Sequence, residues 1–184
     1  MIESRDSYTA GHSTRVATYS KMIAEDMGYS KHECDMLYKA GILHDIGKVS
    51  TPDAVLLKPG KLNDLEYKLI QEHVSVSYHI LHKIPMYKEL SEIIYQHHER
   101  CDGSGYPNKL QADRLHPMAK IMMVCDTFDA MTTSRIYKHK TGIPQALEEI
   151  RSLQGTSFDR KVVASACRVL KDVVIDENIT QKPS

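Results

Sequence analysis

The hydrophobic residues of this 184-residue chain recur mostly every three to four positions, the spacing of amphipathic helices. No long stretch alternates between apolar and polar residues, and no internal repeat is present. The pattern predicts one all-α domain of about eight or nine helices over residues 1–175, followed by a polar, disordered tail at 176–184. The predicted helices cover residues 12–28, 31–46, 63–73, 75–83, 87–98, 117–132, 143–153 and 159–174.

Local signals mark several boundaries of these helices. Ser30, with Glu33 three residues later, predicts a capping box at the start of the second helix. Pro117 suits the first turn of the helix that follows it. Residues 48–58 contain turn-forming residues and predict a loop, with a short hairpin as the alternative, and the glycine-rich residues 102–116 predict irregular structure.

Histidine and aspartate stand at the ends of several predicted apolar stripes. Leu90, Ile93 and Ile94 lead at helical spacing to His97. A single histidine in such a place is more often a hydrogen-bonded core residue than a metal ligand. Burying the whole set without partners would cost several kcal/mol, so a shared cation is favoured. The other members of the set are His12, His44, Asp45, His73 and Asp126.

The kinds of ligand indicate the kind of metal. Imidazole and carboxylate without thiolate favour iron, manganese or a similar divalent ion over structural zinc. The four cysteines are widely spaced and form no CxxC pair. Six or seven ligands exceed one tetrahedral site and suffice for two metals that share a carboxylate. Two such metals can activate a hydroxide for displacement at phosphorus.

Charge and composition exclude other classes of protein. Lys and Arg number 24 and Asp and Glu number 24, so the net charge is zero, which argues against a nucleic acid polymer or an anionic membrane surface as partner. No apolar run approaches the roughly 20 residues of a membrane-spanning helix. The N-terminal residues lack the pattern of a signal peptide, and the cysteines suit a reducing compartment. We expect a cytoplasmic protein without membrane insertion.

Five ordered motifs resemble those of the HD-GYP domain family, a branch of the HD superfamily of metal-dependent phosphohydrolases. The similarity extends over about residues 3–170. It implies a compact HD-superfamily helical domain and a phosphoric diester hydrolase that converts cyclic di-GMP to pGpG, GMP or both. The motifs are "ILHDIGK" (42–48), "KPGKL" (58–62), "HHERCDGSGYP" (97–107), "CDTFDAMTTSRIYK" (125–138) and "GTSFD" (155–159).

The resemblance also implies how two cations would divide the ligands. One cation would take His12, His44, Asp45 and Asp126. The other would share Asp45 and take His73, His97 and His98. Some family members place a glutamate four residues before the first histidine and bind a third metal. Tyr8 stands at that position here, which favours two cations, although Glu3 or Asp6 could also reach the site.

The implied reaction is attack by a metal-bridging hydroxide on a phosphodiester, with Asp45 and Lys48 as the catalytic side chains. Lys48 would stabilise charge on the phosphate, and its alternative role is that of a solvated lysine at a helix end. Asp129 would orient a ligand or a water molecule. Further phosphate contacts are expected from Arg135, Lys138, Lys58 and Lys61.

The turn after the paired histidines contains Gly103, Gly105 and Pro107. We expect both glycines to adopt a positive φ and the proline to fix the exit of the turn. Glu99 and Asp102 are expected to support the ligands or cap the backbone. Tyr106 is left with three roles: packing, contact with the substrate, or docking of a partner.

Two alternatives to cyclic di-GMP hydrolysis stay open. The domain could bind a cyclic dinucleotide, or dock on a diguanylate cyclase, with only weak hydrolysis. It could also hydrolyse another nucleotide, such as cyclic GMP-AMP, although the paired histidines and the GYP turn argue against a nucleotide triphosphohydrolase. A homodimer and an attached sensory or receiver domain are compatible with the same motifs.

Overall fold

The structure is a computed structural model that describes residues 11–133 and 141–175. These residues form nine α-helices, short 3-10 turns and no β-strand, which confirms the all-α prediction. The α-helices are α1 (His12–Asp26), α2 (Lys31–Leu43), α3 (Asp53–Leu56), α4 (Asp64–Gln71), α5 (His73–His82), α6 (Lys88–Tyr95), α7 (Pro117–Thr132), α8 (Ile143–Ser152) and α9 (Arg160–Val169). The 3-10 turns are η2 (Ile46–Ser50), η3 (Pro85–Tyr87) and η4 (Ala112–Arg114).

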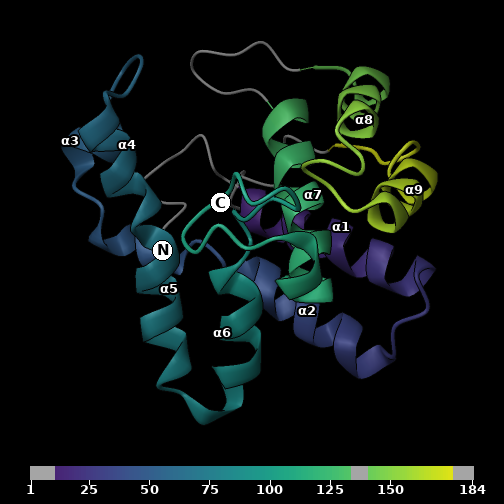
Figure 1. Cartoon of the computed structure of the whole chain (residues 1–184), viewed down its shortest axis with the longest axis horizontal. Helices are drawn as coiled ribbons and strands as arrows, with labels where there is room; N and C mark the ends of the chain where they lie inside the picture. The colour runs from purple at the N-terminus through teal and green to yellow at the C-terminus, as the bar shows by residue number, and fades with distance from the viewer. Residues whose placement is uncertain (1–10, 134–140, 176–184) are drawn as a thin grey trace, which may run out of the picture.

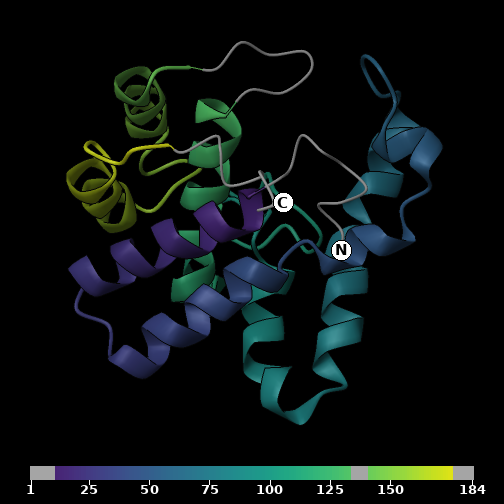
Figure 2. The ribbon, with the colours of Figure 1, turned by 180° about the vertical axis from the view of Figure 1, so that it is seen from behind.

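Helix α7 lies at the centre and packs against α1, α6, α8 and α9 (Figure 1). Met122, Val124 and Phe128 of α7 are fully buried, because this helix meets neighbours on most of its sides. Helices α1 and α2 lie side by side, and α5 and α6 form a second pair (Figure 2). The short α3 and α4 contact each other at one edge, and α4 also contacts α5.

The predicted capping signals have the expected geometry. The Ser30 side chain accepts a hydrogen bond from the Glu33 backbone N–H, and the Glu33 carboxylate accepts one from the Ser30 N–H, which completes the capping box. Asn63 and Glu66 form a second capping box at the start of α4. Pro117 lies in the first turn of α7, as predicted.

Helices α2 and α6 both end earlier than the hydrophobic pattern predicts. Helix α2 ends at Leu43, because the His44 carbonyl accepts a hydrogen bond from Ser77 Oγ, a residue of α5. Helix α6 ends at Tyr95, and the His98 carbonyl accepts a hydrogen bond from the N–H of Tyr106 in the following loop. In both places a carbonyl beyond the helix end accepts a hydrogen bond from outside the helix.

Three other expectations need correction. Residues 48–58 form part of η2 and all of α3, with no hairpin among them. Leu69 and Ile70 of α4 were expected to form a buried stripe leading to His73, but Leu69 is exposed and Ile70 is only half-buried, so this stripe is not core. His73 instead begins the separate helix α5, whose own inner face is buried. The last predicted helix ends at Val169, and the predicted tail at 176–184 lies outside the described residues.

Within the described part of the chain, no helix is both long and apolar enough to cross a membrane.

Candidate metal centre

The seven predicted metal ligands come together from five separate parts of the chain. His12 begins α1, His44 and Asp45 follow α2, and His73 begins α5. His97 and His98 follow α6, and Asp126 lies in α7. Three groups of these residues have ligand atoms within 4.8 Å of one another: His12, His44 and Asp126; His44, Asp45 and His97; and His73, His97 and His98.

Asp45 lies between the two sides of this cluster, and its two oxygens face different partners. Oδ1 is 3.3 Å from His73 Nε2. Oδ2 is 3.5 Å from His44 Nε2 and 3.9 Å from His12 Nε2. Because each oxygen is directed to a different set of imidazoles, the carboxylate has the arrangement needed to bridge two cations.

Three of the histidines are oriented by the backbone of the preceding helical turn. The Nδ1 atoms lie 2.6–2.7 Å from carbonyl oxygens three residues earlier, in His44, His73 and His97. A carbonyl only accepts, so Nδ1 carries the proton and Nε2 is left with a lone pair for a metal. The Nε2 atoms of His73 and His97 are buried and have no hydrogen-bond partner in the described structure. A buried nitrogen lone pair without a hydrogen-bond partner is suited to binding a divalent cation, so both atoms fit the role of metal ligands.

His12 is oriented by a buried carboxylate. Its Nδ1 lies 2.7 Å from Asp129 Oδ2, and its Nε2 lies 3.3 Å from Asp126 Oδ1. Asp129 is fully buried and also accepts hydrogen bonds from Arg15 Nε at 2.7 Å and Nη2 at 3.1 Å. Sequence reasoning missed Arg15, although it lies one helical turn after His12.

The charges of the cluster influence one another. Burial alone would raise the pKa of Asp45, but Lys48 and the neighbouring histidines hold it well below its usual range. Burial would likewise raise the pKa of Asp126, and the hydrogen bond from His12 outweighs it, so this pKa is also well below normal. Both carboxyl groups are therefore ionised at neutral pH.

Four histidines of the cluster divide into two kinds by the direction in which their pKa is shifted. Burial lowers the pKa of His73, His97 and His98, which keeps them neutral at pH 7. Burial also opposes the charge on His12, but hydrogen bonds to Asp126 and Asp129 raise its pKa to about 9. Cations at the cluster would thus find neutral imidazoles at His73, His97 and His98 and would displace a proton from His12.

Hydrogen bonds through Gly47 and Ser77 hold the segment that contains His44 and Asp45 against α5. The Gly47 N–H donates to Ser77 Oγ at 2.8 Å, and Ser77 Oγ donates to the His44 carbonyl at 2.9 Å. A Cβ at Gly47 would overlap the backbone oxygen of His73, so only glycine allows this approach. Ser77 was not identified from sequence, because its role depends on a contact 30 residues away.

The loop that contains the GYP motif folds back on the paired histidines. The fully buried Glu99 accepts hydrogen bonds from the N–H groups of Asn108 at 2.7 Å and Leu110 at 3.0 Å. Gly103 has the expected positive φ of 77°. Gly105 does not, and the expectation of a positive φ there was wrong. A Cβ at Gly105 would lie 2.5 Å from the Arg100 backbone nitrogen, so close approach is the reason for this glycine.

Two other loop residues have local roles in the turn. Asp102 Oδ1 accepts a hydrogen bond from the Ser104 N–H at 2.9 Å, which stabilises the turn rather than reaching the cluster. The peptide bond between Tyr106 and Pro107 is cis.

The basic residues that were predicted to contact phosphate differ in how they lie relative to the ligand cluster. Lys48 Nζ donates a hydrogen bond to Asp45 Oδ2 at 2.6 Å, so it lies beside the cluster. Lys58 forms an ion pair with Glu66 at 2.7 Å, within the α3–α4 region, and Lys61 is exposed. Arg135 and Lys138 lie outside the described residues, as do Tyr8, Glu3 and Asp6.

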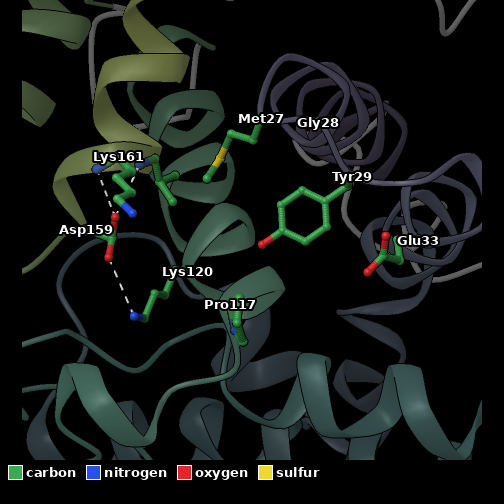
Figure 3. Close-up of a pocket in the computed structure, with 9 residues that line it drawn as sticks. Met27, Gly28, Tyr29, Glu33, Pro117, Lys120, Asp159 and Lys161 are labelled. Atoms are coloured by element: carbon green, nitrogen blue, oxygen red, sulfur yellow. Dashed lines mark hydrogen bonds and ion pairs between the residues drawn. The ribbon is translucent and has the colours of Figure 1, made fainter.

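A separate cavity of about 490 Å³ lies between the end of α1 and the beginnings of α7 and α9 (Figure 3). Met27, Tyr29 and Pro117 supply part of its wall. Lys120 Nζ lies 3.5 Å from Asp159 Oδ2, so its charge already has a partner. None of the predicted site residues that the structure describes lines this cavity, which is therefore distinct from the metal centre.

Comparison with known proteins identifies the family. A family model of the HD domain matches residues 1–162. The chain is 40% identical over 164 residues to 3'3'-cGAMP-specific phosphodiesterase 2 of Vibrio cholerae, with 88% of this chain and 31% of that protein covered. It is 38% identical over 175 residues to a cyclic di-GMP phosphodiesterase of Thermotoga maritima, with 94% of this chain and 48% of that protein covered.

Solved structures show the same fold. The cyclic GMP-AMP-specific phosphodiesterase V-cGAP3 of V. cholerae has 31% identity and a TM-score of 0.58, with 94% of this chain and 39% of that chain covered. The HDG"Y"P protein Bd1817 of Bdellovibrio bacteriovorus has 19% identity and a TM-score of 0.71, with 87% and 51% covered.

The chain belongs to the HD domain family, and its motifs resemble those of the HD-GYP branch. It spans less than half the length of the curated relatives named above.

Proposed function

We propose that this chain is a metal-dependent phosphodiesterase that hydrolyses a cyclic dinucleotide, with cyclic di-GMP as a substrate and pGpG, GMP or both as products. The observation that carries the proposal is the buried set of histidines on either side of Asp45, whose two oxygens face the two sides. Relatives named as cyclic-dinucleotide phosphodiesterases support the choice of substrate class.

Two divalent cations held by the seven ligands would activate water and neutralise phosphate charge. The chain's own side chains have further tasks. The hydrogen bonds that Nδ1 of His44, His73 and His97 donates to backbone carbonyls hold each Nε2 toward the shared space. Asp129 does the same for His12.

Lys48 is the basic residue best placed to contact substrate. Its ammonium group lies beside Asp45, and its side chain is one-fifth exposed, so it can exchange this contact for a phosphate oxygen. There it would stabilise the negative charge that develops during hydrolysis. Arg135 and Lys138 remain proposed phosphate contacts on the strength of their motif alone.

Cyclic GMP-AMP is the second candidate substrate. Proteins named as 3'3'-cGAMP-specific phosphodiesterases are 40% and 34% identical to this chain, which is as close as the cyclic di-GMP enzymes. A signalling module with weak hydrolysis is the alternative to either enzyme.

The test is hydrolysis of cyclic di-GMP and cyclic GMP-AMP by metal-loaded protein, with products resolved by chromatography. Asp45→Ala is the test variant, and Asp172→Ala, at an 84% exposed side chain, is the control. We expect linear products from at least one substrate. Turnover should be lost in the Asp45 variant and unchanged in the control. If protein with two bound metal ions per chain binds the cyclic dinucleotide but releases no product, the proposed hydrolysis is contradicted and the signalling module is favoured.

Iron or manganese as the metal, a homodimer, docking of a diguanylate cyclase, an attached sensory or receiver domain and a cytoplasmic location stay predictions.

A further inference from the structure

His98 differs from the other four histidines of the cluster. His12, His44, His73 and His97 each have Nδ1 hydrogen-bonded, to Asp129 or to a backbone carbonyl. For His98, neither ring nitrogen has a hydrogen bond among the described residues. Its nearest charged partner is Asp126, at 3.8 Å from Nδ1. The ring is also 22% exposed, so neither a hydrogen bond nor full burial fixes its orientation.

An aromatic ring lies against His98 instead. The Tyr106 ring is stacked on it, with the centroids 4.8 Å apart and the planes inclined by 25°. His97 is 4.1 Å away at 41°, and His73 is 5.2 Å away at 83°. His97 and His73 are themselves predicted ligands, so Tyr106 is the member of this ring cluster that is free to act only as a support.

Backbone contacts of the loop hold Tyr106 beside His98. The Tyr106 N–H donates to the His98 carbonyl at 3.1 Å, which ties the two residues together directly. Gly105 allows the loop to approach the backbone of Glu99 and Arg100. The Glu99 carboxylate then holds the far side of the loop at Asn108 and Leu110.

We propose that Tyr106 is a positioning residue, whose ring orients the His98 imidazole toward the cation also held by His73 and His97. This inference rests on the metal centre of the proposed function, but not on the identity of the substrate. Groups that orient metal ligands commonly contribute a factor of about 10–100 to metal affinity.

The hydroxyl group of Tyr106 is not part of this role. It forms no hydrogen bond among the described residues, and burial raises its pKa, so it stays protonated at neutral pH. Phenylalanine should therefore replace tyrosine without loss, whereas a side chain without a ring should not.

The experiment is titration of metal-free protein with Mn²⁺, with free Mn²⁺ measured by electron paramagnetic resonance. The variants are Tyr106→Phe, Tyr106→Leu and Tyr106→Met. Tyr95→Leu is the matched control, because it removes a ring pair of similar geometry, with Tyr78 at 4.6 Å and 34°, outside the ligand set. We expect wild type, Tyr106→Phe and Tyr95→Leu to bind two ions with similar affinity.

Tyr106→Leu and Tyr106→Met should bind one ion normally and the second about 10–100-fold more weakly. Normal binding of the first ion shows that the fold is intact, and the methionine variant is decisive if the leucine variant does not fold. The leucine substitution should have no further effect in a His98→Ala background, since the ring it supports is already gone.

Three results would overturn the proposal: two ions bound at wild-type affinity by both ring-free variants, a tenfold weakening in Tyr106→Phe, or further weakening in the His98→Ala background. Because binding is measured without nucleotide, failure here leaves the phosphodiesterase proposal standing. Conversely, an inactive protein can still pass this test.

Discussion

Replacing Asp129 should disturb both the stability of the protein and its affinity for metal. The Asp129 carboxylate is fully buried and accepts three hydrogen bonds, two from Arg15 and one from His12. Asp129→Ala leaves the guanidinium group of Arg15, whose side chain is 10% exposed, without this carboxylate. Removing one partner of a buried ion pair typically costs about 3–5 kcal/mol.

Asp129→Ala should also weaken metal binding by about 10–100-fold, because His12 loses the group that fixes its ring. Asp129→Asn should have a smaller effect on the metal, since its amide oxygen can still accept from His12 Nδ1–H. Urea denaturation of the metal-free protein measures the first effect, and titration with Mn²⁺ measures the second.

The control is Asp172→Ala, which changes an exposed aspartate and should alter stability by no more than about 0.5 kcal/mol. An Arg15→Met variant and the double variant complete a cycle, and a coupling free energy of about 1 kcal/mol or more is expected for residues in contact. A loss below about 1 kcal/mol in Asp129→Ala, together with unchanged metal affinity, would refute the assigned role of this network.

Three further predictions follow from the same geometry. Gly105→Ala forces a Cβ against the backbone of Glu99 and should cost about 1–3 kcal/mol in thermal unfolding; an unchanged midpoint would show that the loop is not closely packed. Glu99→Gln leaves two backbone N–H groups sharing one acceptor oxygen and should speed hydrogen exchange at Asn108 or Leu110, whereas unchanged exchange rates would contradict this reading. Metal-free protein should be most stable near pH 6.5, as measured by urea midpoints. The raised pKa of His12 stabilises the fold fully below 6.5 and less as pH rises through about 9, and the lowered pKa values of His97 and His98 destabilise it as pH falls below 6.5. A midpoint that rises steadily to pH 9 would contradict the assignment of His12.

Much of the metal centre could be predicted because its ligands stand in recognisable local patterns. The apolar stripe that precedes His97 is buried as expected, since an amphipathic helix directs its last inward position into the core. The capping box at Ser30 and the start of α7 at Pro117 were readable for the same reason: each depends on residues within one helical turn.

The features that escaped prediction depend on contacts between distant segments. Asp129 meets Arg15 across 114 positions, and Ser77 meets Gly47 across 30, so no local pattern pairs them. Gly105 looked like a residue chosen for a positive φ, but its surroundings, rather than its own backbone angle, require a glycine. The exposed Leu69 has the spacing of a core residue, and only the placement of α4 at the edge shows otherwise.

Hydrolysis of a cyclic dinucleotide by this chain should require two cations that share Asp45 as a ligand. Metal-free protein is loaded with increasing amounts of Mn²⁺, and bound metal and hydrolysis of cyclic di-GMP and cyclic GMP-AMP are measured on the same samples. We expect linear products only as the second ion binds, and we expect neither full metal loading nor turnover in Asp45→Ala. Wild-type turnover in the Asp45→Ala variant, or no product from either substrate at two bound ions per chain, would contradict this expectation.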